Sequence, residues 1–167
     1  VVDRGQPDME KAKALMAQSS YKGETVVLLN PSELESFQPF VALTTQALTD
    51  LGMKVEIQNM DWATFLKRRT VSAPVSEGGW NIANAIFSQL DLNSPLANPN
   101  FDARGAAGYT GFVDDPEIER LKTEFQKAGS DAERKAIADK IQLRGHEEVV
   151  YIPLGNYFDY SGARPEV

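Results

Sequence analysis

A strand, a helix and a second strand are predicted in close succession early in the chain. Residues 25–29 (TVVLL) are β-branched or apolar throughout, which is typical of a strand buried on both faces. The apolar residues of 34–51 recur with the helical period, with Pro39 near the start and Gly52 directly after the end. Residues 53–59 alternate as a strand does. Because the connections are short, this order predicts a βαβ unit, with parallel strands and a right-handed crossover.

A short helix with a basic end is predicted to follow the second strand. Asp61 is suited to cap its start, and Trp62, Phe65 and Leu66 form an apolar face. Its end, residues 67–69 (KRR), is cationic. Cations at a helix C-terminus are explained by the helix dipole alone, and contact with an anion is the alternative interpretation.

Three further helices and a strand near the end of the chain are also predicted. An acidic first turn and helical spacing predict a helix over 8–18. Asp115 and Ser130 are suited to cap two later helices, whose inward residues would be Ile118, Leu121, Phe125, Ile137 and Ile141. Residues 149–154 (VVYIPL) are predicted to form a strand, at an edge or a strand end because of Pro153.

Residues 79–112 combine a predicted strand with a long polar loop. The strand would be the apolar run from Trp80 to Phe87, and the passage after it is rich in Pro, Asn and Gly with no helical or strand period. Open α/β sheets bind ligands where strand ends open into such loops. Long structureless connections are also uncommon in compact domains, so this loop is predicted to be functional.

Composition limits the class of protein. The chain has 167 residues, enough for one domain with a full core, and 42% of them are hydrophobic. Its net charge of −7 argues against a nucleic-acid partner, which needs a basic face. It contains no cysteine, which is compatible with an oxidising compartment. Because it begins Val1-Val2-Asp3 and ends without a stop signal after a strand or linker at 162–167, we expect a piece of a longer protein.

The sequence contains few of the residues and motifs that catalysis requires. The chain has no cysteine, no Gly-x-Ser-x-Gly elbow and a single histidine, His146, at the end of a predicted helix. One histidine also leaves zinc without its usual ligands, so neither a metal nor a cofactor is predicted. The glycine-rich segment 105–111 resembles a phosphate-binding loop but lacks the Lys-Ser/Thr pair of the P-loop motif. Binding is therefore favoured over catalysis, with a small phosphate- or nucleotide-binding α/β enzyme using 105–111 as the alternative.

Several short fragments occur in one order along nearly the whole chain. They are PDMEKAKALM at 7–16, QAL with LGMKV at 46–55, DWATF with RR at 61–69, WNI at 80–82, FVDDPEIE at 112–119, and IQ with VYIPL at 141–154. Together they resemble the C-terminal lobe of the family 5 extracellular solute-binding proteins, the dipeptide and oligopeptide receptors of bacterial ABC importers.

This resemblance implies one lobe of a type II periplasmic-binding-protein-like fold, with a mostly parallel sheet flanked by helices. Residues 1–167 would form a single domain that closes on a small peptide or other small solute against a missing N-terminal lobe. The partner would be the membrane permease of an ABC transporter, and the location periplasmic or extracellular, at the cell envelope. An interaction module for its own missing half is a further alternative.

The predicted ligand-binding residues follow the ends of the predicted strands. In the family, a Trp and then an acid commonly follow the strand near 82, and the acid contacts a peptide's amino terminus. This chain departs from that pattern, with Phe near the Trp position, which leaves the identity of the ligand open. The resemblance places Phe87 and Asp91 there, although a core aromatic and an Asx turn are the alternative interpretations. The full predicted set is Asn30, Ser32, Asn59, Phe87, Ser88, Gln89, Asp91, Asn93 and Tyr157.

Overall fold

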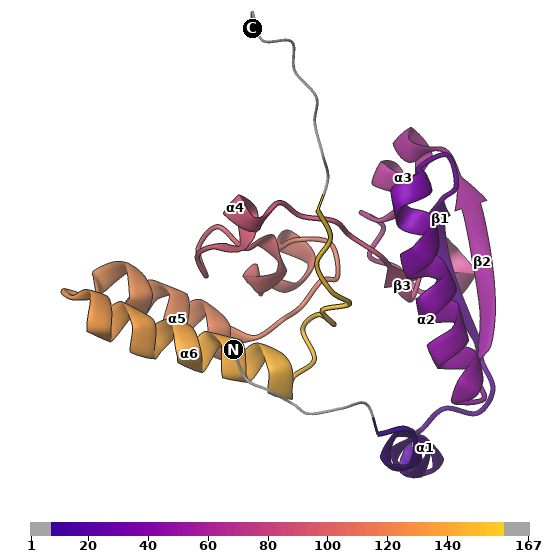
Figure 1. The fold of residues 1–167 in the computed structure, drawn as a ribbon, viewed down its shortest axis with the longest axis horizontal. Coiled ribbons are helices and arrows are strands. Elements are labelled where there is room, and N and C mark those ends of the chain that lie inside the picture. The colour runs from indigo at the N-terminus through magenta and orange to yellow at the C-terminus, as the bar shows by residue number, and fades with distance from the viewer. Residues whose placement is uncertain (1–7, 159–167) are drawn as a thin grey trace, which may run out of the picture.

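The computed structural model describes residues 8–158, and three parallel strands lie at the centre of its first half (Figure 1). The strands are β1 (Thr25–Pro31), β2 (Lys54–Met60) and β3 (Ile82–Ala83), in the order β2-β1-β3. Both pairings of β1 are parallel. The predicted α/β class and βαβ unit are therefore confirmed.

β1 is the central strand because its side chains are apolar on both faces. Val27, Leu28 and Leu29 are all at most 1% exposed. The strand continues through Asn30 and Pro31, beyond the predicted range 25–29, because the ladder with β2 extends to the pair Pro31 and Met60.

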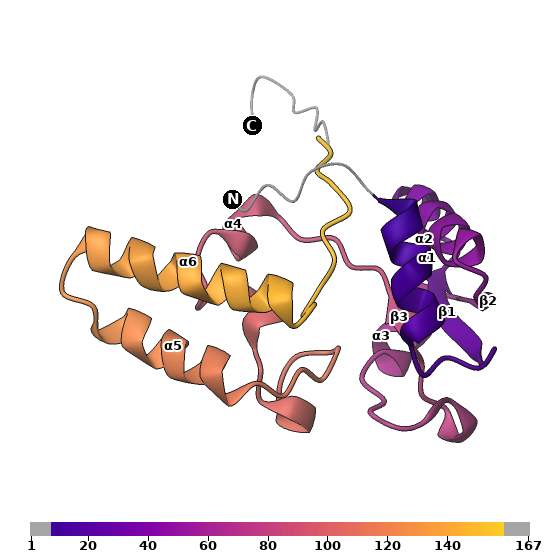
Figure 2. The ribbon, with the colours of Figure 1, turned by 90° about the horizontal axis from the view of Figure 1, so that it is seen from below.

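Helices cover both sides of these strands. α1 (Met9–Gln18), α2 (Gln38–Asp50) and α3 (Trp62–Arg68) lie where the sequence predicts them, and a short 3₁₀ turn, Glu35–Phe37, precedes α2. Figure 2 shows α2 and α3 on opposite sides of the strands.

The second half of the chain is built on a helical hairpin. α5 (Pro116–Lys127) and α6 (Asp131–Glu147) are capped by Asp115 and Ser130, as predicted. Their contact buries a separate apolar cluster, which comprises Phe101, Ala103, Ile118, Leu121, Ala128, Ile137 and Ile141. The sheet has its own cluster, formed by Val27, Leu29, Phe37 and Phe65. A single domain over 1–167 remains a prediction. Within residues 8–158, no helix is long and apolar enough to cross a membrane.

The strand predicted over 80–87 is much shorter in the structure. Only Ile82 and Ala83 pair with β1. Before them, the side chain of Asn81 accepts the hydrogen bond of the Val27 N–H at 2.8 Å, which replaces a ladder contact. After them, Asn84 is buried and its side-chain oxygen accepts a hydrogen bond from Thr44 of α2 at 3.3 Å. The rest of the apolar run is extended chain that packs through its side chains.

The polar loop after this segment is more ordered than predicted. It contains the short helix α4 (Gln89–Leu92) and the 3₁₀ turns Pro99–Phe101 and Gly105–Ala107. Ser88 caps α4 and Asn98 caps the first 3₁₀ turn through side-chain oxygens. Hydrophobic periodicity misses elements of one turn, because they are held by caps and not by an apolar stripe.

The strand predicted over 149–154 is absent. Val149 has a φ of 52°, and the Val150 N–H donates to the carbonyl of Gly145, so the chain turns sharply as it leaves α6. Pro153 has no N–H to offer a ladder. The predicted strand or linker at 162–167 lies outside the described residues.

The cap of α3 predicts a measurable pH dependence of stability. Asp61 accepts hydrogen bonds from the hydroxyl and the backbone N–H of Thr64, and these hold its pKa below the ordinary 3.8. Because the folded-state pKa is lowered, this contribution is present above pH 3.8 and is lost as the pH falls through the folded-state value.

We expect Asp61→Asn to flatten the melting-temperature profile in this acidic range, measured by circular dichroism. Glu35→Gln is the control and should leave the profile unchanged, because Glu35 is exposed and has no side-chain hydrogen bond or ion pair among the described residues. Identical profiles for wild type and Asp61→Asn would contradict the assignment.

Candidate functional site

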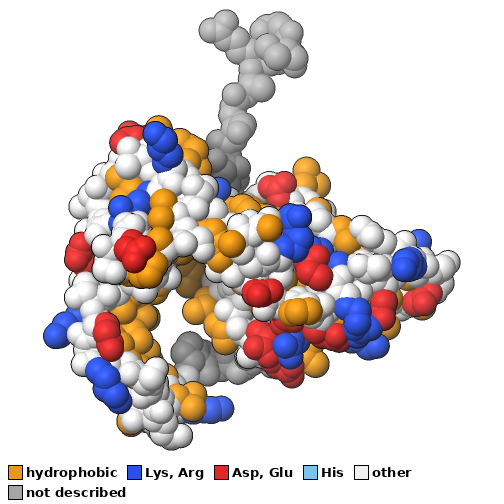
Figure 3. Space-filling model, turned by 180° about the vertical axis from the view of Figure 1, so that it is seen from behind, with side chains coloured by type: hydrophobic (Ala, Val, Ile, Leu, Met, Phe, Trp, Pro, Cys, Tyr) orange, Lys and Arg blue, Asp and Glu red, His pale blue; other side chains and the backbone are white. Residues whose placement is uncertain are grey.

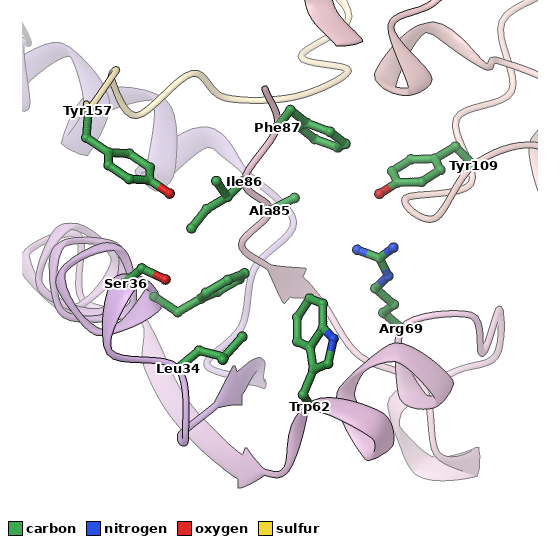
Figure 4. Close-up of a pocket in the computed structure, with 10 residues that line it drawn as sticks. Leu34, Ser36, Trp62, Arg69, Ala85, Ile86, Phe87, Tyr109 and Tyr157 are labelled. Atoms are coloured by element: carbon green, nitrogen blue, oxygen red, sulfur yellow. The ribbon is translucent and has the colours of Figure 1, made fainter. Parts of the chain in front are cut away.

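A cavity of about 320 Å³ lies beyond the carboxyl ends of the three strands. Segments that follow β1, β2 and β3 supply most of its lining, which consists of Leu34, Ser36, Phe37, Trp62, Arg69, Ala85, Ile86, Phe87, Tyr109 and Tyr157 (Figure 4). This edge is where open parallel sheets place ligands. From behind, Figure 3 shows hydrophobic side chains around the hollow between the sheet and the helical hairpin.

Aromatic rings form most of the cavity surface. The Trp62 ring stacks on buried Phe65, with centroids 5.3 Å apart, and Phe37 packs against both of them. On the opposite side, Phe87 and Tyr109 lie 6.0 Å apart. Such a surface suits apolar groups and the flat faces of amides or rings.

Among residues 8–158, Arg69 is the one charged residue in the cavity lining. It follows the last turn of α3, and in Figure 4 its guanidinium extends toward Tyr109. Its Cζ lies 5.5 Å from the Tyr109 ring centroid and 5.9 Å from that of Phe65. Hydroxyls of Ser36, Tyr109 and Tyr157 and the indole N–H of Trp62 are further polar side-chain groups of the lining. The lining thus combines an apolar surface with few polar groups, which is the usual composition of a small-molecule site.

Two predicted site residues line the cavity. Phe87 reaches it from the segment after β3, and Tyr157 from the chain that follows α6. Tyr157 is packed 6.2 Å from Phe40 of α2, centroid to centroid. Tyr157 was expected to follow the end of a strand over 149–154, which is absent. The chain still returns to this edge of the sheet.

Asn30 and Asn59 lie at the predicted strand ends but outside the cavity lining. Asn30 donates to Asn59 Oδ1 at 2.8 Å, and it exchanges hydrogen bonds with the Gln38 side chain at 3.2 Å in each direction. These amides therefore satisfy one another beneath α2. Ser32 is exposed just beyond β1, and its hydroxyl reaches only the Met60 carbonyl, at 3.5 Å.

The remaining predicted residues belong to α4 and its ends. Ser88, Gln89, Asp91 and Asn93 are all exposed and outside the cavity lining. Asp91 accepts hydrogen bonds from the hydroxyl and the backbone N–H of Ser88, at 2.8 and 3.2 Å, which form a capping box. This cap gives Asp91 a structural role, while its contact with a ligand remains a prediction.

Trp62 was not predicted as a site residue, and Arg69 was considered only within residues 67–69, for which contact with an anion is the alternative interpretation. They are seven residues apart, two turns along one helix, and therefore lie on the same face. An aromatic residue and a cation at this spacing, directly after a strand, would have indicated the site. Tyr109 had no comparable signal, because its loop is brought to the cavity by contacts distant in sequence.

The glycine-rich segment 105–111 does not offer a phosphate cradle. The backbone N–H groups of Gly105, Ala107 and Gly108 already donate to carbonyls within the loop and at Val113. Asp102 lies next to it, and the hydrogen bond from Arg104 holds the pKa of this carboxyl below its usual range. A phosphate would find three of the loop's backbone donors already engaged and no Lys-Ser/Thr pair, so the geometry gives the nucleotide-binding alternative no support.

Comparisons with known proteins agree with the predicted resemblance. The chain is 26% identical over 148 residues to a probable peptide ABC transporter periplasmic-binding protein, y4tO, of Sinorhizobium fredii. The alignment covers 89% of this chain and 28% of the relative. The chain is 25% identical over 162 residues to the periplasmic oligopeptide-binding protein OppA of Escherichia coli, which covers 95% of this chain and 28% of OppA. No model of a protein family matches the chain.

Solved structures show the same fold. The ABC transporter substrate-binding protein CtaP of Listeria monocytogenes superposes with a TM-score of 0.71 at 18% identity, over 86% of this chain and 28% of CtaP. These matches confirm the predicted resemblance and the fold of a solute-binding lobe. The chain spans about 28% of the length of the curated relatives it matches.

Proposed function

We propose that this chain is a ligand-binding lobe of a solute-binding protein that captures a small peptide-like solute for an ABC importer. The observation that carries the proposal is the cavity at the carboxyl ends of β1, β2 and β3, in a chain similar in sequence to periplasmic peptide-binding proteins. Aromatic walls can cover the side chains of a peptide, and the few polar groups can orient it. Among residues 8–158, the lining includes no His, Cys, Asp, Glu or Lys.

The remainder of the receptor would supply the second wall of the site. The relatives are more than three times as long as the matched region, and the cavity is open on one side. In two-lobed binding proteins, hinge closure buries the ligand between both lobes and excludes water. We therefore propose a missing N-terminal lobe as the partner within the same polypeptide, and the membrane permease of the importer as the partner in transport. A periplasmic or extracellular location at the cell envelope follows from this role.

Calorimetry with mixtures of di- and oligopeptides tests the proposal, on the product of the complete reading frame that contains this chain. We expect peptide binding, and a loss of about 1.5–3 kcal/mol of binding free energy in Phe87→Ala, because this ring faces the cavity. Leu90→Ala is the control, since Leu90 is 78% exposed and outside the lining. A reading frame without a second lobe, or a melting temperature raised by nucleotides and not by peptides, would overturn the proposal.

The same titration examines the proposed role of Asp91. A carboxylate that holds a peptide's ammonium group would make Asp91→Ala bind amino-terminally free peptides more weakly than wild type, with acetylated peptides unaffected. Equal affinities in both proteins would restrict Asp91 to its contact with Ser88.

A further inference from the structure

The guanidinium of Arg69 is a cation without a counter-charge in the part of the chain that the structure describes. Among residues 8–158, the ion pairs engage Arg104, Arg120, Arg134 and Arg144 but not Arg69. Its Nε is buried and has no hydrogen-bond partner there. A cation that lines a cavity and has no ion-pair partner among these residues favours an anion brought by another molecule.

Its neighbour Arg68 has a structural role, although its Nε is likewise buried and without a hydrogen-bond partner among the described residues. Arg68 Nη2 donates to the Gln58 side chain and to the Gly79 carbonyl, both at 3.2 Å, and so ties α3 to β2. Arg68 is outside the cavity lining and Arg69 is inside it. The helix dipole favours both cations equally. It therefore does not explain why only Arg69 extends into the cavity.

Two aromatic rings hold the Arg69 side chain in place. The rings of Phe65 and Tyr109 lie 5.9 and 5.5 Å from its Cζ, within the range of a cation–π contact. Phe65 is fully buried, which fixes one side of the guanidinium. An arginine positioned in this way presents its N–H groups in a fixed plane, the geometry that binds a carboxylate through two parallel hydrogen bonds.

We propose that Arg69 is the anion-binding residue of the cavity, and that the preferred solute carries a carboxylate next to an aromatic or aliphatic group. The inference rests on the proposed function for the identity of the solute as a peptide. The carboxylate would be the carboxyl terminus or an acidic side chain. Among residues 8–158, the lining includes no acidic side chain, although the chain as a whole has a net charge of −7. The guanidinium therefore gives this cavity a local positive charge that attracts an anion.

Calorimetry with four matched probes tests the inference on the same full-length product. The probes are the peptide Phe-Glu-Phe, its carboxyl-terminal amide, the amide of Phe-Gln-Phe, and 3-phenylpropionate, which is an apolar carboxylate without a peptide bond. We expect wild type to prefer at least one carboxylate-bearing peptide over the uncharged Phe-Gln-Phe amide by about tenfold to a hundredfold. Comparison of the two Glu peptides shows whether the terminal or the side-chain carboxylate is bound.

Arg69→Gln should abolish this preference while it leaves the affinity for the Phe-Gln-Phe amide nearly unchanged. Lys67→Gln is the matched control, because it removes the same charge from an exposed position of the same helix. Peptide binding with an unaltered preference in Arg69→Gln would overturn the inference and leave the proposed function standing. Binding of 3-phenylpropionate that depends on Arg69, without any peptide binding, would overturn the peptide assignment alone. Failure of all four probes to bind would overturn both.

Discussion

Replacement of Phe65 by alanine is expected to lower the free energy of unfolding by about 3–5 kcal/mol. Phe65 is 0% exposed, and its ring packs against Phe37 at 6.0 Å and stacks on Trp62 at 5.3 Å. The substitution removes a large apolar side chain and leaves a void between α3 and β1, since neighbouring rings can fill it only in part. Urea denaturation followed by circular dichroism measures the loss.

Leu66→Ala is the matched control for this prediction. Leu66 is the next residue of α3 but is 37% exposed, so its truncation should cost roughly 1 kcal/mol or less. Similar losses for the two variants would mean that the aromatic cluster does not anchor the helix. Phe65 also contacts the guanidinium of Arg69. We therefore expect the milder Phe65→Leu to lower the binding free energy of carboxylate probes by more than it lowers the free energy of unfolding.

Elements with strong local signals were predictable from the sequence. The caps Asp61, Asp115 and Ser130 are at the predicted helix starts, because a short polar side chain before an apolar stripe determines its own hydrogen bonds. β1 was also identified correctly as a central strand, since burial on both faces leaves a run of apolar residues.

Elements that depend on a distant partner were not predictable to the same extent. The segments 80–87 and 149–154 both have the composition of a strand, but a strand also needs a neighbouring backbone with free ladder groups. Asn81 and Asn84 use side-chain contacts on either side of the short β3, and the turn at Val149 directs the chain away from any ladder. Composition carries no information on such pairings.

The cavity lies where the sequence predicts a site, but only two of the predicted residues, Phe87 and Tyr157, line it. The rule that ligands bind at strand ends predicts the edge of the sheet where the structure has its cavity. Residues of a strand alternate between faces, however, and Leu29 faces the cluster of Phe37 and Phe65, which borders the cavity. Asn30 must then point to the other face, where Gln38 accepts its hydrogen bond. The register of alternation could have excluded Asn30, since it is contained in the sequence.

The cap of α5 gives the second large effect, an expected loss of about 2–3 kcal/mol in Asp115→Ala. Asp115 is 5% exposed, and its Oδ1 accepts hydrogen bonds from the N–H groups of Glu117 and Ile118 at 2.9 and 3.2 Å. Its Oδ2 accepts from Nε of Arg144 on α6 at 2.8 Å, and this contact raises the pKa of Arg144 above its usual range. One carboxylate thus starts α5 and fastens it to α6, so its removal leaves buried donors unpaired at the base of the hairpin.

Asp114→Ala is the control, because Asp114 is the adjacent acid and is exposed. This substitution removes the same charge as Asp115→Ala. We expect Asp114→Ala to stay within about 0.5 kcal/mol of wild type. Hydrogen exchange should show faster opening of α5 and α6 in Asp115→Ala alone, with protection of β1 unchanged, since the hairpin cluster and the sheet cluster share no residue. Equal loss of protection in β1 would show that the two clusters unfold as one unit, and the hairpin would then be as much a part of the cavity's support as the sheet.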